Sequence, residues 1–500
     1  MIQWEERTLR DKESVANLIA QAEKEWGKRK ELYKRFRRKD DSAKIIDESD
    51  EALKVGFEYY ITNMTTGYFA GKEPIYSVEQ VSDEQKKNII TKLLGKIFGQ
   101  KTETEELMTL INYISSYNDD GSEFFDLAFD YFCTSACYEI LYENQENEIV
   151  YSKLDPKTTV AIYDYSVPSN LIGILRKIAI DTNSKTETFE LLTKEGKFYY
   201  YGNEKKGYFE KPEEAQAQKW ADIPAIAIEN EDGIGIFELV ISLINAYERV
   251  VQNSRNTFQY NDDAKLAISG YSPENEIIIQ DEEGNIAENP ARKAEDSAVL
   301  NARTLYFQEG GDAKWLEKNV QDTALQNHKK TLVDLICLIS GVPNMTDLGF
   351  TQADNSSALD KKFFSLEQNI TKADKLFKKG LLRRWELIVN KINTKKNTSY
   401  DFRDIKIALI RNLPTDKATE TNRALQLRGL LSDETIINML PDDIDATSEL
   451  NKMQEQNEEN IKKNIEALKR VGKGAPADEE REEGEEPIQE DRQEPEANEE

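Results

Sequence analysis

Leu332-Val-Asp-Leu-Ile-Cys-Leu-Ile-Ser-Gly-Val-Pro-Asn344 is the stretch that decides how this chain folds. The apolar residues before its glycine recur at spacings of three to four, which is the helical period. Gly341 can take the left-handed conformation that ends a helix, and Pro343 cannot continue one. The helical pattern resumes over Ser356–Lys396, which begins with two serines, both good N-caps. The sequence therefore predicts a helix, a polar loop and a second, long helix.

The second of these helices is basic, although the chain as a whole is acidic. Residues 356–396 hold eleven Lys or Arg and four Asp or Glu, a net charge of +7, whereas the whole chain carries −28. Such a helix can be a solvated face, or it can pair with an acidic neighbour. It can also contact phosphate, or hold in place a loop that faces a polyanion. The simplest interpretation of the whole stretch is two packed core helices joined by a surface loop.

The composition is that of a polar globular protein with several structural units. The 500 residues are 38% hydrophobic and 32% charged, which suits about two to four units that each bury a core. The sequence lacks a run of about eighteen apolar residues, so no membrane span is expected. Its N-terminus has no basic segment followed by an apolar one, so no secretory signal is expected. Three cysteines, Cys133, Cys137 and Cys337, make no disulfide framework and indicate folding in a reducing cytoplasm.

Helices followed by short strands are expected in the first half of the chain. Helical periodicity predicts helices at 11–38, 48–65, 84–97, 103–117 and 122–137. Short, mostly alternating segments bounded by turn residues predict strands of an antiparallel sheet at 138–142, 148–151, 158–163, 174–180, 186–192 and 198–201.

Two possible binding motifs in this half are better explained as structure. Cys133 and Cys137 lie four residues apart on one predicted helix, but zinc needs two more ligands and His328, the only histidine, is far away in sequence. Buried thiols are therefore expected. Gly67-Tyr-Phe-Ala-Gly-Lys-Glu-Pro74 lacks the Walker spacing, and no Ser or Thr follows its lysine, so it predicts a helix-to-strand turn.

The second half continues with helices and one interruption. A helix at 237–261 precedes the segment 263–311, where strands at 264–269 and 304–308 flank an acidic middle and indicate a small separate subdomain. From 397 the pattern is again helical, at 403–411, 418–430, 432–439 and 444–467. The tail, 475–500, has thirteen acids and two arginines and should be disordered.

The sequence offers no recognisable catalytic site. It contains one histidine and none of G-x-S-x-G, H-E-x-x-H or a Walker lysine. The chain has many Asp and Glu residues, so residue counts alone do not exclude a nuclease that binds metal through carboxylates. These acids do not form a recognisable motif, however. We therefore expect no catalytic residue, no metal and no cofactor.

In several segments, taken in order, the chain resembles the portal proteins of tailed bacteriophages, of the type found in siphoviruses of Gram-positive hosts. The similar segments are Gly67–Pro74, Tyr138–Tyr142 with Leu154-Asp-Pro156, Ile223–Ile226 with Phe237–Tyr247, Ala264–Gly270, Asp312–Leu316, and Ser340–Asn344 with Phe350. Each is weak alone, but their shared order over about residues 55–395 is specific. Two positions depart from the family: Ser135 stands where the family has glycine, and Ser356-Ser357-Ala358 stands where the family often has Ser-Gly-x-Ala.

The resemblance implies an α+β, predominantly helical portal fold, assembled as a ring, typically of 12 subunits, with a central channel. The wing would be 1–235, the first stem helix 236–262, the clip 263–317, the second stem helix 318–341, the tunnel loop 342–356, the long wing helix 357–396, the crown 397–470 and a disordered acidic tail 471–500. The ring would occupy one capsid vertex of the virion after assembly in the host cytoplasm.

The resemblance also implies partners and a site. The partners would be double-stranded DNA, the terminase large subunit, a head-completion or adaptor protein, and capsid and scaffolding proteins. An acidic chain suits a conduit through which DNA slides better than it suits a binder. The tunnel loop would present short polar side chains to DNA: Asn344, Thr346, Asp347, Thr351, Gln352, Asp354 and Asn355. Lys361 and Lys362 are the nearest positive charges, and they would either contact phosphate or pair with acids of the adjacent subunit.

Two other functions stay open at this point. One is a helical scaffold or adaptor of the virion that binds nucleic acid through the basic helix. The other is a packaging enzyme whose site the motifs do not reveal.

Overall fold

The computed structural model describes residues 2–37, 53–79, 103–181, 186–203, 205, 207–262, 265–269, 276–280, 286–301, 312–316, 322–345 and 356–412, with a few isolated residues between 421 and 456. The chain divides into two compact units, Met1–Leu413 and Pro414–Glu500, and the architecture below is that of the first. The helix predicted at 84–97, the strand at 304–308 and the acidic tail lie outside the described residues, as do almost all of the helices predicted after 418.

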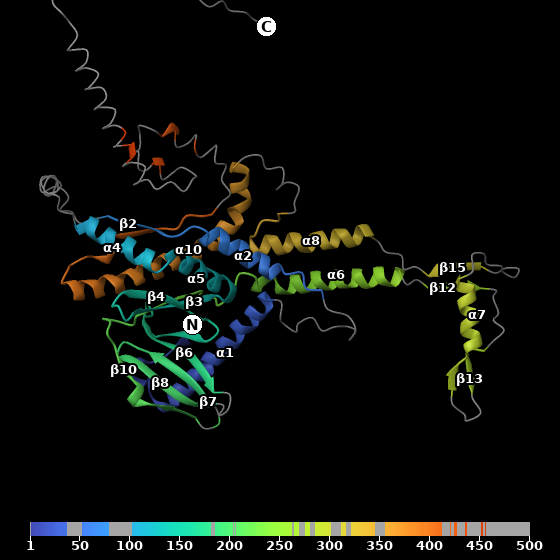
Figure 1. Cartoon of the computed structure of the whole chain (residues 1–500), viewed down its shortest axis with the longest axis horizontal. Coiled ribbons are helices and arrows are strands. Elements are labelled where there is room, and N and C mark those ends of the chain that lie inside the picture. The colour runs from blue at the N-terminus through green and yellow to red at the C-terminus, as the bar shows by residue number, and fades with distance from the viewer. Residues whose placement is uncertain are drawn as a thin grey trace, which may run out of the picture. The chain divides into compact units, whose positions relative to one another are not determined.

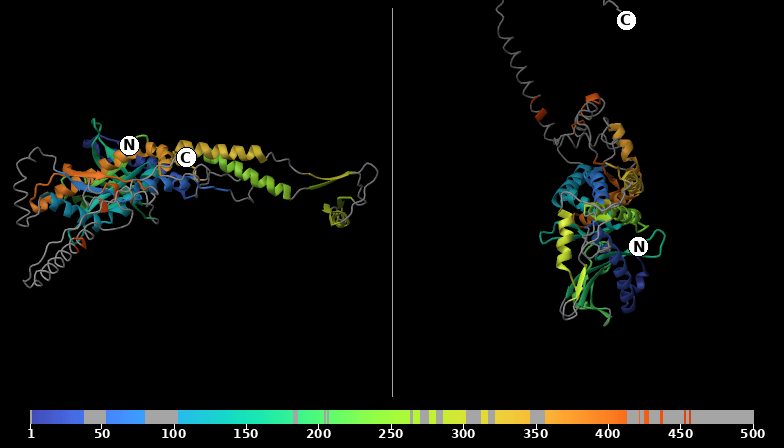
Figure 2. Two further views of the ribbon diagram at one scale, coloured as in Figure 1. Left: turned by 90° about the horizontal axis from the view of Figure 1, so that it is seen from above. Right: turned by 90° about the vertical axis from the view of Figure 1, so that its right-hand side faces the viewer.

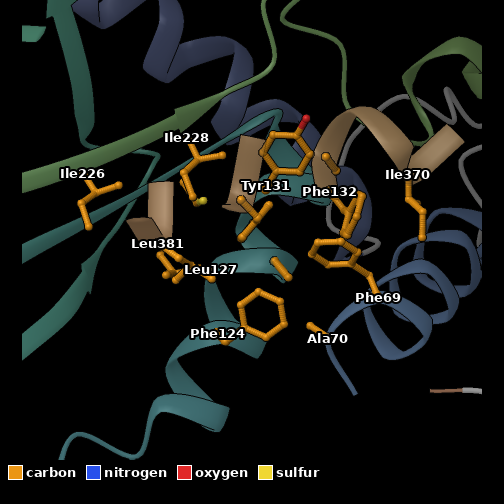
Figure 3. Packing of buried hydrophobic residues seen from close by; sticks show 14 of the residues in the cluster. Phe69, Ala70, Phe124, Leu127, Tyr131, Phe132, Ile226, Ile228, Ile370 and Leu381 are labelled. Atoms are coloured by element: carbon orange, nitrogen blue, oxygen red, sulfur yellow. The ribbon is translucent and has the colours of Figure 1, made fainter. Parts of the chain in front are cut away.

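A helical core forms the centre of the first unit (Figure 1). Its helices are α2 (Phe57–Ala70), α4 (Glu103–Tyr117), α5 (Asp120–Thr134) and the 41-residue α10 (Ser356–Lys396). Figure 3 shows the aromatic residues that α2 and α5 bring together. The ring of Phe69 lies 5.6 Å from that of Phe124 and 5.2 Å from that of Phe377, and all three side chains are fully buried. Large buried aromatic side chains of this kind dominate the energetics of a core.

Two antiparallel sheets adjoin this helical core. The larger has the order β1-β5-β6-β7-β8-β10, with β9 also paired to β8, and the smaller has the order β11-β3-β4. The strands of the larger sheet are β1 (Ile2–Gln3), β5 (Thr159–Tyr163), β6 (Leu171–Asp181), β7 (Thr186–Leu192), β8 (Gly196–Asn203), β9 (Gly207–Glu210) and β10 (Gln216–Ala217). The strands of the smaller sheet are β3 (Ala136–Glu143), β4 (Ile149–Leu154) and β11 (Ala225–Glu229). All six predicted strands are present, and only β1 pairs in parallel, with β5.

Helix α1 (Lys12–Phe36) covers one face of the larger sheet. Its buried stripe includes Leu18, Ile19 and Trp26, and the indole of Trp26 stacks on Phe189 of β7 with ring centroids 6.1 Å apart. Since alternate side chains of a strand point to opposite faces, one apolar helix stripe is enough to bury one face of the sheet. The amphipathic helix predicted at 11–38 is confirmed.

A pair of helices leads away from this body (Figures 1 and 2). The 3-10 turn η4 (Glu238–Val240) precedes α6 (Ile241–Asp262), and α6 packs along α8 (Asp322–Ser340). The segment between them contains β12 (Lys265–Ser269), which pairs with β15 (Asp312–Leu316). It also contains β13 (Ile278–Gln280) paired with β14 (Ile286–Glu288), and α7 (Pro290–Asn301). The helix predicted before this segment and the helix predicted after it are both confirmed.

Two local predictions are wrong. Residues 403–411 are not helical, because η5 (Phe402–Asp404) is followed by β16 (Ile405–Ala408), which pairs with β2 (Ile75–Val78). Residues 397–412 therefore fold with the first unit. Cys137 is not on a helix with Cys133, because α5 ends at Thr134 and Cys137 lies on β3. Both thiols are nevertheless buried, as expected.

Helix α5 ends where Ser135 takes a left-handed conformation, with φ of 68°. Its N–H bonds to the carbonyl of Tyr131, which is the αL type of helix C-cap. Glycine is the residue that adopts this conformation without strain, and this is the position where the portal resemblance expects glycine. We expect Ser135→Gly to raise the free energy of unfolding by about 0.5–1 kcal/mol, measured by chemical denaturation. Ser135→Ala keeps the strained Cβ and should give no gain, so equal effects of the two variants would contradict this explanation.

Candidate functional site

The structure describes both ends of the predicted tunnel loop. Asn344 and Met345 are described, and α10 begins at Ser356, one of the two expected caps. Thr346, Asp347, Thr351, Gln352, Asp354 and Asn355 lie outside the described residues, as does the side chain of Lys361. Lys362 is partly buried in the second turn of α10. The assignment of these residues to a DNA path stays a prediction, and the described geometry concerns how the loop is held.

The first end of the loop is fixed by the last turn of α8. Gly341 has φ of 74°, the left-handed conformation that its sequence context predicted. The amide of Asn369 on α10 donates a hydrogen bond of 3.0 Å to the carbonyl oxygen of Ser340. The positive φ favours glycine, and a Cβ on Gly341 would lie 2.4 Å from that amide nitrogen, so it would also displace the Asn369 side chain.

A tyrosine of α2 holds the next residues of the loop. The hydroxyl of Tyr60 donates a 2.7 Å hydrogen bond to the carbonyl oxygen of Pro343. Burial raises the pKa of Tyr60, so the hydroxyl keeps its proton and stays a donor at neutral pH. The turn after α8 is therefore held to α10 by Asn369 and to α2 by Tyr60.

The other end of the loop is also held by α2. The ring of Phe363, in the second turn of α10, stacks on Tyr68 with centroids 5.2 Å apart and an interplanar angle of 12°. The hydroxyl of Tyr68 donates to Glu367, and Arg411 bonds the same carboxylate and that of Asp374. Tyr60 and Tyr68 are eight residues apart on α2, or roughly 12 Å at the rise of an α-helix. A single short helix thus fixes both ends of the loop.

Helix α10 is fixed in the body by a buried charge cluster around Arg384. This side chain has no solvent exposure and makes two parallel hydrogen bonds to Glu139 of β3, at 2.8 and 2.6 Å. It also pairs with Asp120 of α5, which in turn accepts hydrogen bonds from the hydroxyls of Tyr76 and Tyr151. Burial alone would lower the pKa of Arg384, but Glu139 and Asp120 outweigh burial and raise it well above the usual value. The cluster joins α10 to β2, α5, β3 and β4.

Five further basic groups of α10 also face acidic partners within the chain. The pairs are Lys372–Asp232 at 2.9 Å, Lys378–Asp374 at 2.8 Å, Arg383–Asp222 at 2.6 Å, Lys391–Glu143 at 3.1 Å and Lys395–Glu143 at 3.4 Å. Of the alternatives that its +7 charge left open, pairing with acidic neighbours is the one the structure shows for these residues. The pairs with acids outside the helix offset part of its +7 charge.

Two carboxyl groups of α5 bind protons more tightly than usual. Burial raises the pKa of Glu123 to about 7, with the neighbouring charge of Glu139 adding to the effect. Burial likewise raises the pKa of Asp130 to about 6. Glu123 is half-buried, and its Oε1 has no hydrogen-bond partner among the described residues. The folded chain therefore favours the protonated form of both carboxyls more strongly than the unfolded chain does.

Folding stability should depend on pH through Glu123. A raised carboxyl pKa adds stability that is complete below the unfolded value of 4.5 and is lost as pH rises through about 7. We expect Glu123→Gln to remove this loss and to stabilise the protein at pH 8 by on the order of 1 kcal/mol, after allowance for solvent. Thermal unfolding between pH 5 and pH 8 measures it, with Glu146→Gln in an exposed hairpin as control. A variant with the same pH profile as the wild type would contradict the assignment.

The described part of the chain contains no candidate metal site and no candidate membrane span. There, no three or more His, Cys, Asp or Glu side chains are grouped so that they could hold a metal ion. Among the same residues, no helix combines the length and the apolarity that crossing a bilayer requires.

Comparisons with known proteins give one family model, and it covers most of the chain. The sequence model of the family described as phage portal protein, SPP1 Gp6-like, matches residues 17–463. No curated protein matches. Among solved structures, a chain from the neck of the empty GTA particle, computed with C6 symmetry, aligns with a TM-score of 0.39 and 12% identity, covering 77% of this chain and 90% of that one. A chain from the neck of the native GTA particle, computed with C12 symmetry, aligns with a TM-score of 0.41 and 11% identity, covering 77% and 89%.

The chain belongs to the phage portal protein family, and its role is that of a portal channel. The family assignment made from the short motifs is confirmed, while the Gram-positive host stays a prediction. The family is structural rather than enzymatic. The fold is mixed, with helices and sheets.

Proposed function

We propose that this portal protein assembles as a ring, of 12 subunits, around a channel through which double-stranded DNA enters and leaves a phage capsid. The observation that carries the proposal is the family match over residues 17–463. The charge pattern supports it, because the chain is −28 overall and at least six of the eleven basic groups of α10 pair with acids of the same chain. A channel lined by such subunits would repel DNA weakly and would not bind it tightly.

The parts of the ring follow the expected division of the chain. Residues 1–235 with 357–396 form the wing, α6 and α8 lie in the stem segments 236–262 and 318–341, and 263–317 forms the clip. The tunnel loop is 342–356. We place the crown after Leu413 and not at 397, since 397–412 fold with the first unit.

The partners and location follow from this role. The ring sits at one capsid vertex of the virion after assembly in the host cytoplasm, in contact with capsid and scaffolding proteins. The terminase large subunit docks on the clip during packaging, and a head-completion or adaptor protein replaces it afterwards. Hydrolysis of ATP belongs to the terminase, and the portal itself is not an enzyme.

The clip assignment is supported by the exposure of apolar residues in the described part of the segment 263–317. Ile277, Ile278 and Ile286 are 64%, 53% and 75% exposed, and the strands β13 and β14 form a pair with no third strand among the described residues. A two-stranded sheet is marginally stable by itself in water, so contacts with other chains are expected to complete it.

Two experiments test the proposal. Electron microscopy and light scattering of the purified protein should show rings of several hundred kDa, and a monomer at all concentrations would contradict it. Deletion of 272–300 should leave soluble protein that fails to support packaging in particles. If that variant packages DNA normally, the clip assignment is wrong even though the ring stands.

A further inference from the structure

Helix α6 lies between two different neighbours within one chain. On one flank it packs along α8. On another, the short segment 53–56, here called the strap, is bonded to its side chains. The N–H of Leu53 donates to Gln252 at 3.2 Å, and the N–H of Val55 donates to Glu248 at 3.0 Å. Figure 2 shows α6 between α8 and the strap in the view from above. The outer sides of α8 and of the strap are therefore separate surfaces.

The outer side of α8 is apolar near the C-terminal end of the helix. Leu335, Leu338 and Ile339 are 37%, 70% and 44% exposed, while Leu332 and Ile336 on the inner side are buried. Residues 331–341 contain a single charged residue in a chain that is 32% charged. Leu239, in the turn η4 that contacts α8, is also 64% exposed. Exposed apolar side chains gathered in this way mark an interaction surface.

The strap presents a smaller surface of the same character. Leu53 and Val55 are 37% and 41% exposed. Lys54, between them, is less exposed than either, so the two apolar side chains are the ones that the strap presents outward. Because their N–H groups are bonded to α6, the strap is held in a fixed position on the helix and does not depend on a partner to order it.

The charge of the chain indicates what covers these surfaces. Two copies that each carry −28 repel one another, so a contact between them must lie where charge is locally low. A basic partner such as a Lys-rich protein would need the opposite, an acidic face. A ring also requires a heterologous contact, in which one surface of a subunit meets a different surface of the next. The α8 face carries little charge, and the two most exposed side chains of the strap, Leu53 and Val55, are apolar, with Lys54 between them less exposed.

We propose that the outer face of α8 in one subunit contacts the strap of the next subunit. This inference rests on the proposed ring and names the surfaces that close it. Leu335, Leu338 and Ile339 then bury their side chains against Leu53 and Val55 of the neighbouring copy.

Disulfide cross-linking tests the pairing directly. The variant Val55→Cys/Leu338→Cys is made in a Cys337→Ser background, which removes the partly exposed native thiol, since Cys133 and Cys137 are buried. Mild oxidation should give a ladder of covalent oligomers that ends at the full ring. Each single-cysteine variant should give no ladder. A disulfide-linked dimer from Leu338→Cys alone would show a self-complementary contact and would overturn the proposal.

Charge substitution gives the second measurement. Leu338→Asp and Val55→Asp should each abolish rings in light scattering and leave folded monomers by circular dichroism. The matched control is Val167→Asp, which changes a residue 99% exposed in the loop between β5 and β6 and should leave rings intact. The proposed contact is wrong if the wild type forms rings, the double-cysteine variant gives no ladder and Leu338→Asp still assembles. In that case the proposed function still holds. A wild-type protein without rings would reject both.

Discussion

Replacing Arg384 with alanine is expected to lower the free energy of unfolding of the first unit by about 3–5 kcal/mol. The substitution leaves Glu139 and Asp120 buried without their counter-charge, and two tyrosine hydroxyls bonded to a carboxylate that is no longer neutralised. Uncompensated buried charge is far more costly than a lost ion pair at the surface. Urea denaturation followed by tryptophan fluorescence reports the loss, because Trp385 is the next residue on α10 and is itself buried.

The adjacent residue provides the control. Arg383 pairs with Asp222 and Glu386, but about a third of its side chain is exposed, so Arg383→Ala should cost no more than about 1 kcal/mol. Arg384→Met together with Glu139→Gln and Asp120→Asn removes all three charges and should recover part of the loss. If Arg384→Ala and Arg383→Ala are equally stable, the buried cluster does not hold α10 in place.

The double variant Lys361→Glu/Lys362→Glu is expected to assemble normally and to package much less DNA. These lysines stand in the second turn of α10, next to the end of the tunnel loop, and reversal changes the local charge by four units at every subunit of the proposed ring. The glutamates would place negative charge around the channel, and this charge would repel phosphate instead of attracting it transiently. The measurement is the amount of DNA per purified particle, together with the rate of packaging.

Lys372→Glu is the matched control, since it reverses an exposed charge on the same helix three turns further from the loop. Normal packaging by the double variant would take both lysines out of the DNA path. Loss of the ring in the double variant alone would indicate that the lysines pair with acids of an adjacent subunit.

The sequence predicted those features whose causes are local. Gly341 and Pro343 define the end of α8 by themselves, since backbone conformation is decided at each residue, and the structure has that end where the pattern put it. The strands after α5 alternate and are bounded by turn residues, so they too could be predicted. The strand β16 could not, because Ile-Lys-Ile-Ala alternates over only four residues and its partner β2 lies more than three hundred residues earlier.

The buried cluster escaped prediction for a related reason. Arg384 lies between Leu381 and Ile388 on the apolar side of α10, and a charged residue at such a position is the only signal that the sequence contains. Without knowledge of Glu139 and Asp120, which are more than two hundred residues away, that arginine is indistinguishable from one at the edge of an amphipathic helix. The partners of Tyr60 and Tyr68 are similarly distant.

Because Tyr60 and Tyr68 of α2 hold the two ends of the loop, the length of the loop can change without disturbing the structure around it. Closing a flexible loop between fixed points costs free energy that grows only with the logarithm of its length, roughly 0.6 kcal/mol for each doubling. Insertions or deletions between Met345 and Ser356 therefore leave Tyr60, Tyr68 and the helices that they hold almost unaffected. Natural or engineered variants can therefore differ in the number of residues in this loop while the rest of the subunit keeps its fold.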